Sequence, residues 1–171
     1  IKARRRYKGN NDKMEIKKDS IKITIDEESQ IGNARRIAST LAQSINFSEN
    51  VASNTAIIVT EFATNLIKHC QGGEILLRVL KANGFYGLEI LSIDKGPGIK
   101  DVSLAMKDGY TTAGTLGGGL GAIKRLSNDF DLYTQVGKGS VFLSRVYSNA
   151  YLSEINNFPF EFSAISLPKD G

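Results

Sequence analysis

The stretch that decides the fold is residues 74–99, EILLRVLKANGFYGLEILSIDKGPGI. Two runs rich in Ile, Leu and Val, residues 74–80 and 86–93, flank a segment that contains Asn83-Gly84. Asn-Gly favours the two-residue turns that join antiparallel strands, because both residues tolerate positive φ. The stretch therefore predicts an antiparallel hairpin whose second strand ends at Asp94.

Before this hairpin, the chain shows one strand pattern and two helix patterns. Residues 21–25 alternate isoleucine with polar residues, which is typical of a half-buried strand. A first helix, with Asp26 or Ser29 as its N-cap, is predicted by an apolar stripe of Ile31, Ala34, Ala38, Leu41 and Ile45. A second helix is predicted from about Ser48 to Gly72-Gly73, with a stripe of Val51, Ile58, Phe62 and Leu66.

After the hairpin, residues 100–115 have weak periodicity and predict a loop that contains a short helix. Residues 120–126 predict another helix. The runs DFDLYTQV and SVFLSRVYS, joined by Gly137-Lys138-Gly139, predict a second hairpin. This order predicts an α+β fold, a two-layer sandwich in which helices cover one face of a mostly antiparallel mixed sheet.

Composition limits the class of protein. The 171 residues carry a net charge of +4 and are 41% hydrophobic, which is enough to bury a core. The single cysteine, Cys70, excludes an internal disulfide. No long apolar run or apolar leader is visible, so we expect a cytoplasmic protein without a membrane span.

The chain is expected to divide into three parts. Residues 1–19 form a basic arm with Arg4, Arg5, Arg6 and Lys8, residues 20–148 form the domain, and residues 149–171 form an extension or linker. The arm has no interleaved aromatic residues, so a solvated tail is favoured over a nucleic-acid contact.

Glycines at residues 117–121 precede the last predicted helix in TTAGTLGGGLGAIKRL, residues 111–126. A P-loop is excluded because Ala122 and Ile123 stand where it needs lysine and a hydroxyl residue. A dinucleotide fingerprint is excluded because a polar loop, not a strand, feeds the glycines. Bare N–H groups and the helix dipole could bind an anion, while turn geometry or close packing explains the same glycines equally well.

Three further motifs carry candidate chemistry. In EFATNLIKH, Glu61 and Asn65 lie four residues apart on one helix face, where they could accept a proton and bind magnesium. In DKGPGI, Asp94 closes a strand and could accept a hydrogen bond from an exocyclic amine. The third motif is GKGS, residues 137–140. Each also has a structural explanation: a polar outer face, a turn after a strand, and a hairpin turn.

Taken in order, EFATNLIKH, DKGPGI, GGGLGAIKRL and GKGS resemble the motifs of the GHKL ATPase superfamily. The resemblance covers residues 20–148 and implies the fold of that superfamily. It is strongest to the anti-sigma-factor serine/threonine kinase branch, especially to domains joined to a metal-dependent serine/threonine phosphatase domain. Residues 149–171 would then lead toward such a phosphatase domain.

The resemblance implies ATP and Mg²⁺ as ligands and assigns roles to particular residues. Glu61 would be the catalytic base, Asn65 would hold magnesium, and Asp94 would bind the adenine amino group. Residues 107–115 would cover the triphosphate. The implied nucleotide-binding residues are Asn65, Lys68, Asp94, Gly96, Gly98, Thr111, Thr112, Gly117, Gly118, Gly119, Leu120, Gly121 and Ser140.

Two functions follow from this resemblance. The first is a protein serine/threonine kinase that transfers the ATP γ-phosphate to a hydroxyl of an antagonist-type regulatory protein. The second is an ATP-responsive module that binds a sigma factor or controls a fused phosphatase without turnover of its own. A homodimer is expected from relatives in this branch. A histidine kinase is disfavoured, because the single histidine, His69, lies on the helix that carries Asn65.

Overall fold

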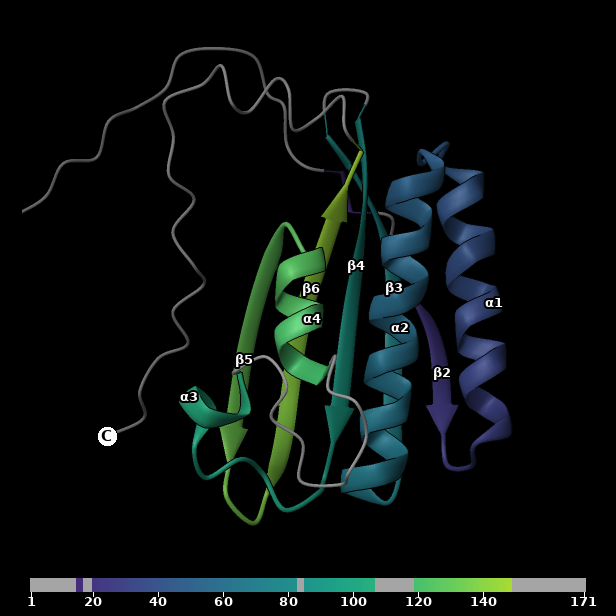
Figure 1. The fold of residues 1–171 in the computed structure, drawn as a ribbon. Coiled ribbons are helices and arrows are strands. Elements are labelled where there is room, and N and C mark those ends of the chain that lie inside the picture. The colour runs from purple at the N-terminus through teal and green to yellow at the C-terminus, as the bar shows by residue number, and fades with distance from the viewer. Residues whose placement is uncertain (1–14, 17–19, 83–84, 107–118, 149–171) are drawn as a thin grey trace, which may run out of the picture.

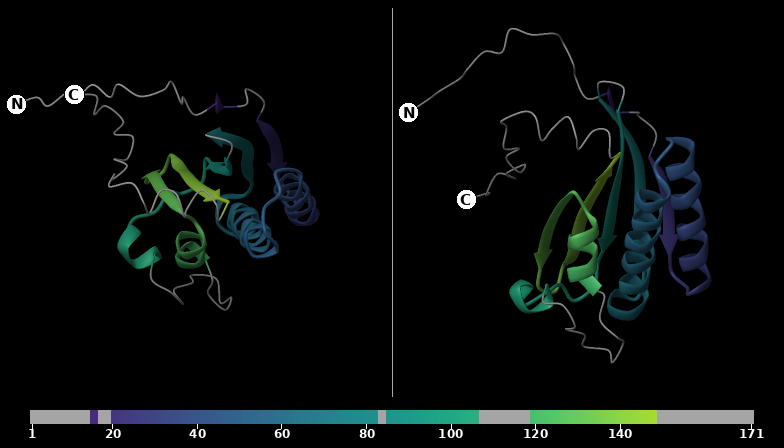
Figure 2. Two further views of the ribbon diagram at one scale, coloured as in Figure 1. Left: turned by 90° about the horizontal axis from the view of Figure 1, so that it is seen from above. Right: turned by 45° about the horizontal axis from the view of Figure 1, so that its top comes forward.

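The computed structural model describes residues 15–16, 20–82, 85–106 and 119–148, and these form one sheet with helices on one face (Figure 1, Figure 2). The strands are β1 (Glu15–Ile16), β2 (Ile21–Ile25), β3 (Gly73–Ala82), β4 (Phe85–Asp94), β5 (Asp129–Gln135) and β6 (Gly139–Tyr147). The helices are α1 (Ser29–Ser44), α2 (Glu49–Cys70), α3 (Val102–Ala105) and α4 (Gly119–Leu126). The predicted two-layer α+β sandwich is confirmed.

The sheet has the order β1-β3-β4-β6-β5, and β2 also pairs with β3. Every pairing among the described strands is antiparallel. Both predicted hairpins are confirmed, with Ala82 opposite Phe85 in the first and Gln135 opposite Gly139 in the second. Strand β1 was not predicted; it lies in the segment expected to be an arm and pairs with Lys81 and Leu80.

The helix ends differ in part from their predictions. Ser29 is the first residue of α1 rather than its cap, and the N-cap residue, Glu28, makes no side-chain capping bond. The second helix begins close to the predicted Ser48, which is the N-cap of α2; its hydroxyl accepts from the Val51 N–H at 3.5 Å. At the other end of α2 the left-handed residue is Gln71, with φ +59°, one position before the predicted glycines.

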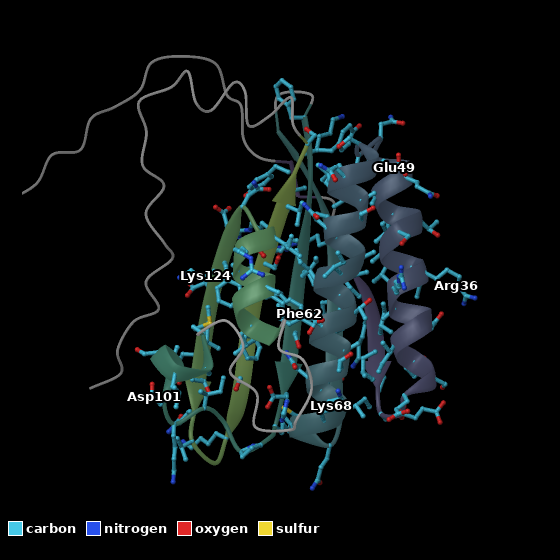
Figure 3. The ribbon with its side chains drawn as sticks, viewed as in Figure 1. Arg36, Glu49, Phe62, Lys68, Asp101 and Lys124 are labelled. Carbon is cyan, nitrogen blue, oxygen red and sulfur yellow. The ribbon has the colours of Figure 1, made fainter. Side chains whose placement is uncertain are left out.

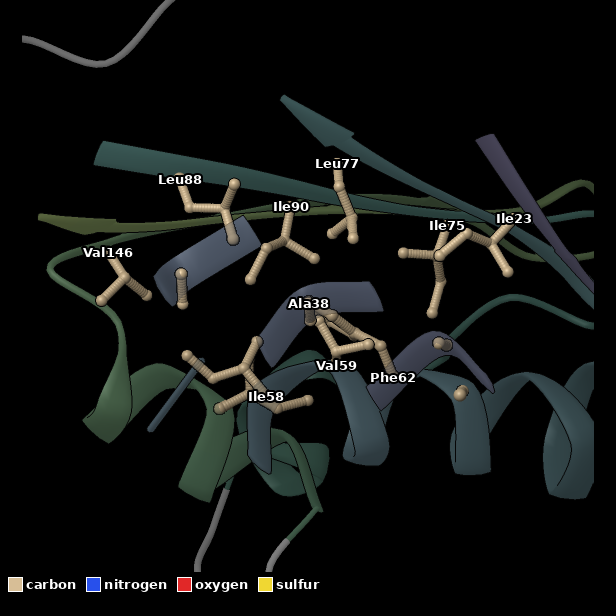
Figure 4. Close-up of a cluster of buried hydrophobic side chains, with 14 of the residues drawn as sticks. Ile23, Ala38, Ile58, Val59, Phe62, Ile75, Leu77, Leu88, Ile90 and Val146 are labelled. Carbon is tan, nitrogen blue, oxygen red and sulfur yellow. The ribbon is translucent and has the colours of Figure 1, made fainter. Parts of the chain in front are cut away.

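The core lies between the sheet and helices α1 and α2 (Figure 4). Phe62 of α2 is 1% exposed, and its ring centroid lies 5.7 Å from that of Phe142 in β6. Small residues on α1, Ala34 and Ala38, are fully buried and allow the two helices to pack closely. The predicted stripe of α2 is buried throughout, and burying each large side chain contributes about 1.5–3 kcal/mol.

A row of charged side chains crosses the opposite face of the sheet. Arg78, Glu89, Arg145 and Asp129 are successive cross-strand neighbours on β3, β4, β6 and β5. Glu89 is 3% exposed and pairs with both arginines; the Arg145 Nη2–Glu89 Oε2 distance is 2.8 Å. Burial lowers the pKa of Arg145, but the hydrogen bond and charge of Glu89 outweigh this effect and raise it. The network explains how a carboxylate is tolerated inside the sheet.

Candidate functional site

The candidate site lies at one end of the sheet, where β4 ends and β6 begins (Figure 1). Asp94 and Ser140 are direct cross-strand partners, although they are 46 positions apart in the sequence, from 94 to 140. The C-terminal end of α2 and the start of α4 lie at the same end. All four motifs singled out in the sequence therefore contribute residues to this region. They do so through the C-terminal end of α2, the end of β4, the start of α4 and the turn before β6.

Asp94 is the most informative residue of this region. It is 6% exposed, and its Oδ1 accepts the Gly96 N–H at 2.8 Å. Its Oδ2 is buried and has no hydrogen-bond partner among the described residues. A buried carboxylate oxygen without a partner is costly, because its desolvation is not compensated. The arrangement fits a ligand that brings a hydrogen-bond donor to this oxygen.

Ser140 belongs to a hydroxyl network that links β6 to β5 and to the connection after Asp94; this network and connection form what we call the floor of the site. Its Oγ lies 2.9 Å from Thr134 Oγ1, and Thr134 Oγ1 also accepts the Ile99 N–H at 2.9 Å. Thr134 was not among the predicted site residues. The only sequence signal for it is its position in the second hairpin, five residues before Gly139 and opposite Ser140. Thr134 fixes both Ser140 and the connection that follows Asp94.

Glycines bring the backbone of this connection against the β5–β6 turn. Gly139 has φ +104°, and a Cβ there would lie 2.1 Å from the Asp94 carbonyl oxygen. Gly98 has φ +68°, and a Cβ there would lie 2.3 Å from the Gln135 carbonyl oxygen. At these two positions only glycine combines the positive φ with so close an approach. Their first role is therefore structural, and it holds Asp94 in place.

The candidate residues of α2 lie in the C-terminal half of this helix. Glu61 and Asn65 are half-buried and one helical turn apart, so they share a face of the helix. Lys68 is exposed at the C-terminal end of α2, far from Glu49 at the other end (Figure 3). Phe62 lies between Glu61 and Asn65 in the sequence, and its ring is buried in the core. The helix therefore cannot rotate about its axis without exposing that ring. This packing fixes the direction in which Glu61 points.

The start of α4 supplies the described part of the glycine run. Gly119 has φ +25°, and a Cβ there would meet no described atom within 4 Å. Close packing therefore does not explain this glycine, although its backbone conformation does. Leu120 and Gly121 follow in the first turn of α4 and are half-buried. Thr111, Thr112, Gly117 and Gly118 lie outside the described residues.

Two neighbouring side chains complete the region. Cys70, the last residue of α2, is half-buried, and burial first, then the charge and hydrogen bonding of Asp94, raise the pKa of its thiol to about 12. His69 is exposed. The described residues contain no group of three or more His, Cys, Asp or Glu side chains that could hold a metal ion.

No helix in the described parts of the chain is long and apolar enough to cross a membrane.

Comparison with known proteins now adds to this geometry. Residues 23–143 match the model of the histidine kinase-like ATPase domain, and the chain belongs to this family. The family expected from the four motifs is thereby confirmed.

A curated relative narrows the comparison. The chain is 32% identical, over 118 residues, to serine/threonine-protein kinase RsbT of Bacillus subtilis (strain 168). The match covers 69% of this chain and 89% of the relative. This relative is a serine/threonine-protein kinase, the kind of enzyme that the four motifs led us to expect.

Proposed function

We propose that this domain binds Mg-ATP and transfers the γ-phosphate to a serine or threonine hydroxyl of an antagonist-type regulatory protein. The observation that carries the proposal is the buried Asp94 carboxylate with its unpartnered Oδ2, beside Ser140. Adenine presents an exocyclic amine that could satisfy this oxygen. The similarity to a serine/threonine-protein kinase supports phosphotransfer as the reaction.

The base-binding end of the proposed site consists of Asp94, Gly96, Gly98 and Ser140. Asp94 Oδ2 accepts a hydrogen bond from the base, while the Gly96 N–H holds the other carboxylate oxygen. Gly96 has no Cβ that would fill the space next to the carboxylate. The phosphate end consists of the α4 start, where N–H groups and the helix dipole favour anions. Gly119, Leu120 and Gly121 are its described members.

Glu61 is the proposed base and Asn65 the proposed magnesium ligand. Magnesium bound with ATP would neutralise phosphate charge, and it commonly takes only one or two protein ligands besides phosphate oxygens and water. A single carboxamide on α2 fits that requirement, whereas an all-protein cage is not needed. Glu61 accepts the proton of the attacking hydroxyl, and Lys68 adds positive charge near the same end of the helix.

Phosphotransfer is tested by replacing Glu61 with glutamine, which keeps the shape but removes the base. We expect Glu61→Gln to bind Mg-ATP as the wild type does and to lose phosphotransfer by about 10²–10⁴-fold. Glu49→Gln is the matched control, since Glu49 lies at the opposite end of α2 (Figure 3). The measurements are calorimetry with Mg-ATP and detection of phosphoserine or phosphothreonine on a candidate regulatory protein. Equal transfer by Glu61→Gln and wild type would remove Glu61 from the mechanism.

The same assay separates the kinase from the ATP-responsive module. A wild-type chain that binds Mg-ATP but transfers no phosphate would support a regulatory module that binds a sigma factor or controls a phosphatase. The homodimer and a phosphatase domain after residue 171 stay predictions from the sequence resemblance, and the cytoplasmic location stays a prediction from the composition.

A further inference from the structure

Cys70 and Asp94 meet where helix α2 and strand β4 end together. Both residues lie close to the position that a Cβ would occupy on Gly96. This point lies 3.0 Å from Asp94 Oδ1, 3.0 Å from Cys70 Cα and 3.0 Å from Cys70 Cβ. Cys70 and the Asp94 carboxylate therefore both border the position that a Gly96 side chain would fill, and glycine leaves this position free.

The chemistry of this contact defines what the thiol can do. Because its pKa is raised to about 12, Cys70 stays protonated at neutral pH. A protonated thiol is a weak nucleophile, so a redox or covalent role is disfavoured. It is also a weak hydrogen-bond donor, and the acceptor beside it is the Asp94 carboxylate.

Asp94 itself supplies the second, independent observation. The residue is more than nine-tenths buried, Oδ1 is held by Gly96, and Oδ2 has no partner within the described part of the chain. The orientation of this carboxylate therefore depends on one strong hydrogen bond and on its neighbours. Cys70 is the neighbour that offers a donor from the helix side.

We propose that Cys70 is a positioning residue of the base pocket, whose thiol donates to the Asp94 carboxylate and keeps Oδ2 directed at an amino group of the bound base. This inference rests on the proposed nucleotide site and assigns Cys70 a part in its selectivity. A carboxylate aligned in this way accepts from a base with an exocyclic amine, such as adenine. When the base carries an oxo group at that position, as hypoxanthine does, the carboxylate faces a second hydrogen-bond acceptor, and the two oxygens repel each other.

The test is calorimetry with Mg-ATP and Mg-ITP on the wild type, Cys70→Ala, Cys70→Ser, Asp94→Asn and the Cys70→Ala/Asp94→Asn double variant. We expect Cys70→Ala to weaken ATP binding about three- to tenfold, the effect of losing one ordinary hydrogen bond. Cys70→Ser keeps a donor of similar size, so its affinity should stay within about twofold of the wild type. In the Asp94→Asn background, Cys70→Ala should have no further effect.

The double variant distinguishes positioning from packing. If Cys70→Ala weakens ATP binding equally in both backgrounds, or if Cys70→Ser binds as poorly as Cys70→Ala, the thiol acts only by filling space and the inference is wrong. Unchanged ATP binding by Cys70→Ala also overturns it, while leaving the proposed function intact. A wild type that binds no Mg-ATP at millimolar concentration would instead overturn the proposed function and this inference together. Thermal unfolding of each variant confirms that it is folded.

Discussion

Replacing Gly139 with alanine should destabilise the domain and disturb the proposed nucleotide site. Replacing Gly137 with alanine should destabilise the domain mildly and leave the site unchanged. Both glycines lie in or beside the β5–β6 turn, and both have positive φ, +104° and +77°. They differ in what a methyl group would meet. At Gly137 there is no described atom within 4 Å, but at Gly139 the Asp94 carbonyl oxygen is 2.1 Å away.

The expected magnitudes follow from these two environments. Gly137→Ala forces an L-residue into the left-handed region, which costs about 1–2 kcal/mol of the free energy of unfolding. Gly139→Ala carries at least that conformational cost, and the methyl group must also push the backbone of Asp94 and Lys95 away. Overpacking of this kind adds about 1–3 kcal/mol. We therefore expect a total loss of about 2–5 kcal/mol for Gly139→Ala.

Urea denaturation followed by circular dichroism measures the free energy of unfolding of both variants. Calorimetry with Mg-ATP, at a temperature where both remain folded, measures the state of the site. Gly139→Ala should bind ATP at least about tenfold more weakly, because a displaced Asp94 no longer aligns its carboxylate. Gly137→Ala should bind as the wild type does. Equal destabilisation and equal ATP affinity of the two variants would refute the view that the turn holds Asp94 in place.

Three further predictions concern stability. Phe62→Ala should lower the free energy of unfolding by about 3–5 kcal/mol in urea denaturation, whereas Ile57→Ala, 45% exposed on the same helix, should change it by less than about 0.5 kcal/mol. Glu89→Ala should cost about 2–3 kcal/mol, less than for a fully buried pair because both arginines reach solvent, and a loss below about 1 kcal/mol would contradict the network. Because folding raises the pKa of Cys70 from 9.0 to about 12, the proton it retains stabilises the fold, and this stabilisation is complete below pH 9 and lost as the pH rises toward 12. The unfolding free energy of the wild type relative to Cys70→Ser should therefore begin to fall near pH 9 and continue to fall as the pH rises toward 12, and a constant difference would contradict the shift.

The helices and strands from residue 20 onward were predictable because their signals are local. Asn83-Gly84 marked the first hairpin, and apolar spacing marked the stripe of α2 that packs into the core. Strand β1 was not predicted because a strand of two residues shows no periodicity. Its partner residues in β3 are also more than 60 positions away in the chain, as for Ile16 and Leu80. The α1 cap was misplaced because the helix begins without a side-chain cap, so neither Asp26 nor Ser29 supplied the expected bond.

The site was predictable where its residues stand in motifs and not where they depend on strand register. Asp94, Ser140, Glu61 and Asn65 could be selected from the order of the motifs. The structure pairs Asp94 with Ser140 and places Glu61 and Asn65 one helical turn apart on α2. Thr134 could not be selected, since a lone threonine in a strand pattern has no distinguishing mark before its partner, Ser140, is known. Cys70 could not be selected either, because its proximity to Asp94 arises only where α2 and β4 end close together. The roles of all these residues stay predictions until binding and transfer are measured.

The connection after Asp94 explains why base selectivity should reside at this end of the site. Pro97 accepts the Gly137 N–H at 2.8 Å, and Thr134 accepts the Ile99 N–H at 2.9 Å. Two hydrogen bonds thus join the connection to the β5–β6 hairpin on either side of a glycine that permits close approach. A floor held in this way does not need to be ordered by the ligand, so little binding free energy is lost in forming it. Discrimination between an amine and an oxo group requires such a fixed acceptor, since a carboxylate free to rotate would turn away from the wrong base at little cost. Selectivity should therefore be lost by changes that loosen this floor, even when they leave the phosphate end untouched.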